Sequence, residues 1–242
     1  MERNERGAYI YQRFRTRGVN PLYPAYIFSE IEVLSEQIFG SRIFLGWEEL
    51  MVKIATVINS ERLSQHAIHA VELRLYPSGE TEIVTEKAFY LEPFPLRAIR
   101  PVAKPYRVTS DLLLAPTSAR DALLDLCKSE SALPSESIAM WIDHNNEITA
   151  IDGASVVAVT DDEVIFSQHG RGIEFDLAKS AMEKTSHHVV QGAIPYDNVR
   201  RYKEILYIDH RGVVALGSIE GRQLSNIIAE RIVQEVKKLE KI

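Results

Sequence analysis

The 242-residue chain contains a single cysteine, Cys127, and no long hydrophobic run. One cysteine excludes an intramolecular disulfide and a cysteine-based metal cluster, so a reducing cytoplasmic compartment is the simplest expectation. No stretch approaches the roughly 18 uncharged apolar residues of a membrane-spanning helix. Residues 1–18 are too charged to supply the apolar core of a signal peptide. We therefore expect a cytoplasmic protein that does not associate with a membrane.

Positive charge is also scarce. The chain has 28 Lys and Arg residues against 34 Asp and Glu residues, which gives a formal net charge of -6. Because nucleic-acid-binding proteins usually carry a basic surface, this balance argues against a nucleic-acid partner. The arginines at positions 3, 6, 13, 15 and 17 are interpreted as a solvated terminus rather than as an anion-binding surface.

Hydrophobic periodicity predicts an α+β fold. Apolar residues recur every three or four positions in the predicted helices, which are residues 25–39, 47–58, 117–128, 172–184 and 223–241. Gly40 stands where a helix C-cap is expected. Predicted strands cover residues 8–14, 67–76, 82–90, 137–142, 154–159, 163–166, 203–208 and 213–219. Prolines at positions 93, 95, 101 and 105 indicate an edge strand and a connector, and we expect a domain boundary near residue 110.

Familiar catalytic and metal-binding motifs are missing. The seven histidines include no His-Glu-x-x-His pattern, and no carboxylate pair at helical spacing completes a metal site, so none is predicted. The chain has no Gly-x-Ser-x-Gly elbow and no Walker-type phosphate loop. Cys127 lies among the apolar positions of a predicted helix, which favours a buried structural thiol. His187 and His188 are interpreted as a surface loop pair.

Two glycine–arginine segments are candidates for anion binding. Arg171, Gly172 and Ile173 directly precede a predicted helix, whose free backbone N–H groups would favour an anion. His210 and Arg211 follow a predicted strand in a tight turn. A phosphate between the two segments would be well held. The alternative, which composition alone favours, is two ordinary glycine-containing turns with exposed arginines.

The second half of the chain also resembles a known family. Residues 147–166, EITAIDGASVVAVTDDEVIF, resemble the hallmark segment of the class IV aminotransferases. These are pyridoxal-phosphate (PLP) enzymes of fold type IV, and they include branched-chain and D-amino-acid aminotransferases and aminodeoxychorismate lyase. Residues 170–224 resemble the remainder of the family's second domain. The resemblance covers residues 110–242 well and residues 1–100 loosely, with residues 25–40 at the place of the family's first helix.

This sequence lacks the family's charged residues at the positions that the resemblance matches. Residues 112–121, where the family has its Schiff-base lysine, contain no lysine, and the nearest are Lys104 and Lys128. The glutamate that pairs with the pyridine nitrogen falls on Ala150, and Glu147 lies three positions too early. Other family positions are also altered: the asparagine falls on Ser155, the arginine of the Gly-Ile-Thr-Arg helix start on Phe175, the phosphate-binding residues of the first helix on Tyr26 and Ser29, and the phosphate-turn threonine on His210 or Arg211.

The resemblance therefore implies the family fold without its chemistry. We expect a two-domain class IV aminotransferase-like fold, with residues 1–110 and 111–242 on either side of a cleft, and a homodimer. The expected function is that of a pseudoenzyme without catalytic residues or bound PLP. A small anionic ligand would bind in the cleft at Arg171, Gly172, Ile173, His210 and Arg211.

Two alternatives remain open. The first is an active PLP-dependent aminotransferase or aminodeoxychorismate-type lyase, in which Lys104 or Lys128 replaces the missing lysine and PLP is bound. The second is a structural or protein-interaction module whose cleft is filled by side chains.

Overall fold

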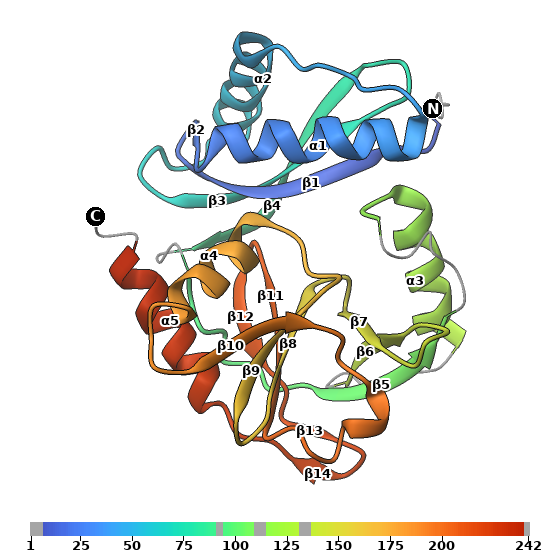
Figure 1. Cartoon of the computed structure of the whole chain (residues 1–242). Coiled ribbons are helices and arrows are strands. Elements are labelled where there is room, and N and C mark those ends of the chain that lie inside the picture. The colour runs from blue at the N-terminus through green and yellow to red at the C-terminus, as the bar shows by residue number, and fades with distance from the viewer. Residues whose placement is uncertain (1–6, 91–93, 109–114, 131–136, 240–242) are drawn as a thin grey trace. The chain divides into compact units, whose positions relative to one another are not determined.

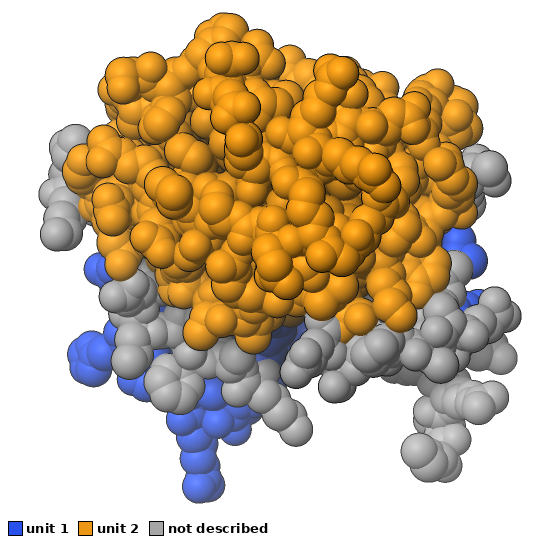
Figure 2. Space-filling view, turned by 90° about the horizontal axis from the view of Figure 1, so that it is seen from below, with its two compact units in different colours: residues 1–93, 115–126 blue, residues 94–114, 127–242 orange. Residues whose placement is uncertain are grey.

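The computed structural model describes residues 7–90, 94–108, 115–130 and 137–239, without the side chains of residues 87–90 and 127–130. The chain forms two compact units, coloured separately in Figure 2. Unit 1 comprises Met1–Pro93 and Ala115–Leu126, and unit 2 comprises Phe94–Leu114 and Cys127–Ile242. Within the described residues, no helix has the length and apolar character needed to cross a membrane.

The division into units differs from a single boundary near residue 110. Residues 94–108 belong to unit 2, and residues 115–126 return to unit 1. Backbone hydrogen bonds hold that return segment: the Tyr11 N–H donates to the Pro116 carbonyl and the Ser118 N–H to the Tyr9 carbonyl, both at 2.9 Å. The interleaved order could not be predicted from local patterns because it depends on these long-range contacts.

Unit 1 is a four-stranded sheet with helices against it (Figure 1). Its strand order is β2-β1-β3-β4, and every neighbouring pair is antiparallel. The elements are β1 (Ile10–Arg17), β2 (Asn20–Pro21), α1 (Pro24–Phe39), α2 (Trp47–Ser60), β3 (Ile68–Leu75), β4 (Thr81–Tyr90) and α3 (Ser118–Glu130).

Helices α1 and α2 pack their apolar faces on one side of this sheet. The shared core includes Ile31 of α1, Ile54 of α2 and Leu73 of β3, which are all fully buried. Gly40 ends α1 in the left-handed conformation, with φ 73°, as the sequence predicts. The helices predicted at residues 25–39 and 47–58 are confirmed.

Unit 2 contains two five-stranded sheets. Their strand orders are β10-β9-β8-β11-β12 and β14-β13-β5-β6-β7. The elements are β5 (Val102–Arg107), β6 (Ser137–Ile142), β7 (Ile148–Ile151), β8 (Ser155–Val159), β9 (Glu163–Ser167), α4 (Ile173–Met182), β10 (His188–Gly192), the 3-10 helix η2 (Tyr196–Asn198), β11 (Glu204–Asp209), β12 (Gly212–Ala215), β13 (Ser218–Ile219), β14 (Arg222–Gln223) and α5 (Ile227–Leu239).

Alternation along the strands creates three layers in unit 2. Val157 of β8 and Leu206 of β11 face the core shared with α4 and α5. Their neighbours Val156 and Ile205 face the core shared with the second sheet. Because successive strand residues point to opposite faces, the first sheet is covered by helices on one side and by the second sheet on the other. The α+β class is confirmed.

The expectation that the proline-rich segment forms an edge strand is wrong. Strand β5 lies in the middle of its sheet, between β6 and β13. It tolerates Pro105 because β13 pairs only with Val102 and Ala103, so that side of β5 has no strand partner at the proline. Short strands β7 and β10 were not predicted, and β12 and β13 form in place of one long strand.

Candidate functional site

The two segments predicted to bind an anion lie at the same end of the β8–β11 pair. The Ser155 hydroxyl of β8 donates to the Arg171 carbonyl and accepts from the Arg171 N–H, both at 2.8 Å. Ser155 is also the cross-strand partner of Ile208, two residues before His210. Strand pairing therefore brings the turn at residues 171–173 and the turn at residues 210–211 to the same end of the sheet.

The guanidinium of Arg211 already has a carboxylate partner. Its Nε atom donates to Oδ2 of Asp209 at 2.8 Å, and the Arg211 N–H donates to Oδ1 at 2.7 Å. His210 is buried, with only 5% of its surface exposed. An anion at this turn would compete with Asp209 for Arg211.

Carboxylates also occupy the beginning of α4. Gly172 is the N-cap residue, with φ 104°, and its carbonyl accepts from the N–H groups of Phe175 and Asp176. Glu174, which is 3% exposed, and Asp176 lie in the first helical turn. These negative charges already complement the helix dipole, which reduces the attraction that the turn offers to a second anion.

Phe175, where the resemblance places the family arginine, is a core residue. Its ring is 1% exposed and meets the Phe166 ring edge-on at 5.2 Å. Gly170 lies directly against this ring, and a methyl group at Gly170 would come within 2.1 Å of it. The side chain is therefore enclosed between β9 and α4. An arginine at this position would bury a charge without a partner, which is strongly unfavourable.

Ala150, where the resemblance places the family glutamate, lies on β7 opposite Trp141 of β6. It is half-buried and offers only a methyl group. The nearest carboxylate in sequence, that of Glu147, turns toward the segment after β9, where the Gln168 side-chain amide donates to it at 2.8 Å. This geometry agrees with the expectation that Glu147 does not substitute at position 150.

Of the two lysines that could replace the missing one, the structure describes the side chain of Lys104 but not that of Lys128. Lys104 is half-buried on β5, opposite Ala139 of β6. Lys128 lies in the helix α3, but its side chain is outside the described residues, as is that of Cys127. Residues 112–114 of the 112–121 window are likewise outside the described residues. Thr117 caps α3, because its hydroxyl accepts from the Arg120 N–H at 3.0 Å.

Several charged groups act on Tyr207, the strand residue that precedes Ile208. Burial raises the pKa of its hydroxyl to about 12, Arg97 and Arg211 lower it, and Asp209 and Asp152 raise it. The phenol therefore stays neutral at physiological pH. Two arginines and two acids are thus close enough to act on this one hydroxyl.

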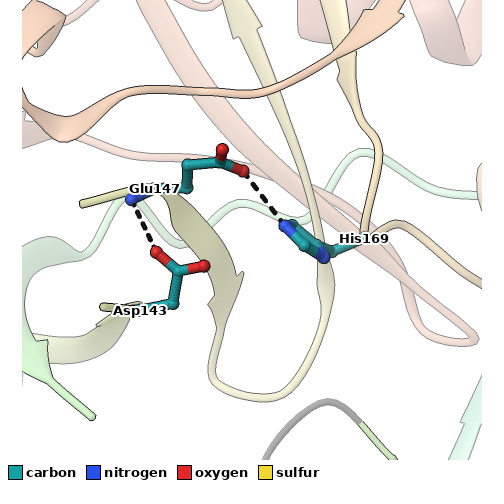
Figure 3. Close-up of side chains that lie close together, drawn as sticks. All are labelled: Asp143, Glu147 and His169. Atoms are coloured by element: carbon teal, nitrogen blue, oxygen red, sulfur yellow. Dashed lines mark hydrogen bonds and ion pairs between the residues drawn. The ribbon is translucent and has the colours of Figure 1, made fainter. Parts of the chain in front are cut away.

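The structure brings together a side-chain cluster that the sequence did not predict (Figure 3). Asp143 and Glu147 come from the β6–β7 turn, and His169 follows β9. Potential ligand atoms of the three residues all lie within 4.8 Å of one another. The sequence did not predict this cluster, because the proximity of the three residues depends on how the fold places β7 and β9.

The expected solvated terminus is wrong for two of the three described arginines, whereas Arg17 is exposed as expected. Arg13 pairs with Glu72 at 2.8 Å and with Asp121 at 3.5 Å, and Arg15 is 2% exposed. Arg3 and Arg6 lie outside the described residues. His188 begins β10 rather than lying in a loop, although its side chain is exposed as predicted.

The chain has the fold of the class IV aminotransferases. A candidate branched-chain amino acid aminotransferase from Thermotoga maritima matches with a TM-score of 0.74 and 14% identity, over 97% of this chain and 88% of that one. A candidate 4-amino-4-deoxychorismate lyase from Legionella pneumophila matches with 0.72 and 9%, over 95% and 90%. An aminotransferase from Brucella abortus bound to PLP matches with 0.73 and 11%, over 97% and 89%.

No protein-family model matches the sequence, and no curated protein matches it at a significant level. At identities of 9% to 15%, the structural matches establish the architecture and not the chemistry. At the positions where the resemblance places the family's charged groups, the side chains do not fit PLP: Ala150 offers a methyl group where a carboxylate would pair with the pyridine nitrogen, and Phe175 fills a core. Acids lie beside both turns: Asp209 pairs with Arg211, and Glu174 and Asp176 lie in the first turn of α4.

Proposed function

We propose that the protein is a non-catalytic member of the class IV aminotransferase-like proteins. The observation that carries the proposal is the chemistry of the positions at which the family has its charged groups. Residues 112–121 contain no lysine. Ala150 and Phe175 contribute a methyl group and an enclosed phenyl ring in place of a carboxylate and a guanidinium.

The lysine and the carboxylate that are missing here have essential roles in the family's reaction. A PLP-dependent aminotransferase needs a lysine to hold the cofactor and to move protons, and a carboxylate to keep the pyridine ring protonated. A methyl group can do neither. Loss of a group on which the whole reaction depends removes most activity, whatever the rest of the pocket retains.

An amino-transfer assay tests the proposal. Purified protein is incubated with excess PLP, each of a panel of L- and D-amino acids, and 2-oxoglutarate, and amino acid products are quantified. We expect no product above the rate with PLP alone. Aminodeoxychorismate is tested in parallel for release of 4-aminobenzoate. Turnover that scales with protein concentration in either assay would contradict the proposal.

The competing proposal of an active enzyme requires a relocated lysine. Lys104 is the candidate whose side chain is described, and Lys104→Ala would then abolish any turnover while Lys179→Ala, on α4, would not. If both variants retained the wild-type rate, Lys128 would be the remaining candidate.

We further propose that the protein is a cytoplasmic homodimer, as the resemblance implies. Light scattering on purified protein, coupled to gel filtration, tests the oligomeric state. The expected molar mass is twice that of one chain at micromolar concentration. A mass equal to one chain would show that the assembly expected from the family is absent.

We also propose residual anion binding at Arg171, Gly172, Ile173, His210 and Arg211. With inorganic phosphate at ten times its dissociation constant, binding to the native state would add about 1.4 kcal/mol to the free energy of unfolding. The Tm would then rise by about 3 °C. Arg171→Ala should remove this increase, whereas Arg231→Ala, on α5, should preserve it. An equal increase in both variants would indicate a general salt effect.

A further inference from the structure

The cluster of Asp143, Glu147 and His169 combines two hard carboxylates with one imidazole. Asp143 and Glu147 are four residues apart in the β6–β7 turn, whereas His169 comes from the segment after β9. Figure 3 shows the Glu147 carboxylate pointing toward the His169 ring, and the Nε2 atom of His169 lies 3.1 Å from Oε2 of Glu147. Two carboxylates and an imidazole form a ligand set suited to zinc-like divalent ions.

The turn holds Asp143 in a fixed orientation. Its Oδ1 atom accepts from the backbone N–H groups of Asn145 and Glu147, each at 2.9 Å. The contact of its Oδ2 atom with the Asn145 amide is long, at 3.5 Å. One oxygen therefore orients the carboxylate, and the other has lone pairs for a ligand. A site whose groups are already positioned loses less entropy on binding.

Glu147 is anchored on the other side of the cluster. The Ile148 N–H, next in the chain, donates to the Ile194 carbonyl at 2.8 Å, and Glu147 itself forms a bridge with Pro195. The side chain of Gln168 donates to Oε2. These contacts tie the β6–β7 turn to the segments after β9 and β10, so the three potential ligands are held by different parts of unit 2.

The charge of the cluster is uncompensated. Among the described side chains, no Lys or Arg forms an ion pair with Asp143 or Glu147, and the one ionisable group that pairs with Glu147 is His169. The side chains of His169 and Glu147 are 24% and 17% exposed. The two carboxylates are half-buried, and an imidazole is neutral when it ligates a metal. The site is therefore net negative, and water and ions can reach it.

We propose that Asp143, Glu147 and His169 bind a zinc-like divalent cation. Bonds of about 2.0–2.2 Å would place the three ligand atoms roughly 3.4 Å apart, so small side-chain rotations close the present arrangement around the ion. Three protein ligands leave at least one coordination position for water. The site is independent of the proposed loss of PLP chemistry, since none of its residues stands at a position assigned to that chemistry.

Titration of metal-free protein with Zn2+ and with Co2+ tests the proposal. We expect one Zn2+ ion per chain by calorimetry, and a visible Co2+ absorption band that Zn2+ abolishes. Glu147→Gln and His169→Gln should each weaken Zn2+ binding by at least about 10- to 100-fold, since changes to groups that only orient a ligand already cost that much. His144→Gln is the matched control, because this exposed histidine lies in the same turn and outside the cluster.

The variants distinguish this site from other histidines. If the wild type binds no Zn2+, or if both cluster variants bind it as tightly as His144→Gln does, the proposal is wrong. Loss of binding in His188→Gln with retention in His169→Gln would place the ion elsewhere and would equally contradict it. Circular dichroism of each metal-free variant, compared with wild type, verifies that lost binding does not reflect lost folding.

Discussion

Phe175→Arg is expected to unfold unit 2. The wild-type ring is enclosed by the core that α4 shares with β8, β9 and β11. A guanidinium at this position would be buried without a partner, and we expect a loss of more than about 4 kcal/mol in the free energy of unfolding. Since a domain is stable by only about 5–15 kcal/mol, much of the protein should be unfolded or insoluble.

Two matched variants separate charge from volume. Phe175→Leu keeps an apolar side chain and should cost clearly less than Phe175→Arg. Ala150→Glu, on half-buried β7, should leave the protein folded. Urea unfolding followed by circular dichroism measures all three. A stable, soluble Phe175→Arg protein would contradict the account, because it would mean that this position can still hold the arginine that the resemblance places there.

Glu204→Ala should cause the second large loss of stability. The Glu204 carboxylate, 1% exposed on β11, accepts from the Ile228 N–H at 2.9 Å and from the Ala229 N–H at 3.2 Å. The Ser225 hydroxyl donates to it at 2.8 Å. It therefore caps α5 from a distant strand and places a negative charge at the positive end of the helix.

Removing this carboxylate leaves two buried N–H groups without an acceptor. We expect Glu204→Ala to lower the free energy of unfolding by about 3 kcal/mol or more. Glu204→Gln retains one acceptor oxygen and should lose less. Glu230→Ala, an exposed acid in the first turn of α5, is the control and should change stability by about 0.5 kcal/mol or less. Equal losses for Glu204→Ala and Glu230→Ala would refute the capping role.

The sequence predicts elements well where one local rule decides. The amphipathic helices α1 and α2 have a clear period and, in α1, a glycine C-cap, so their positions follow from local residues. Pro105 misleads because proline usually excludes a central strand, and only the shortness of β13 permits it here. Arg13 and Arg15 mislead because their partners and burial come from strand pairing far along the chain.

The candidate sites also differ in whether local sequence could predict them. The Arg171 and Arg211 turns were found from glycine and arginine neighbours, and pairing of Ser155 with Ile208 brings them to one end of the sheet. Asp209, which occupies Arg211, is two residues from it and could have been recognised as a partner. His169 is 22 residues from Glu147, so no spacing rule could join them.

The central claim is that no lysine of this chain holds PLP, and borohydride trapping tests it most directly. Protein incubated with stoichiometric PLP is reduced, digested and mapped by mass spectrometry, alongside an aliquot reduced before PLP is added. The account predicts only a small amount of label, spread over several lysines, and no absorption band that persists after gel filtration. Stoichiometric label on one lysine, Lys104 or Lys128 above all, would contradict the claim and establish a relocated Schiff-base site.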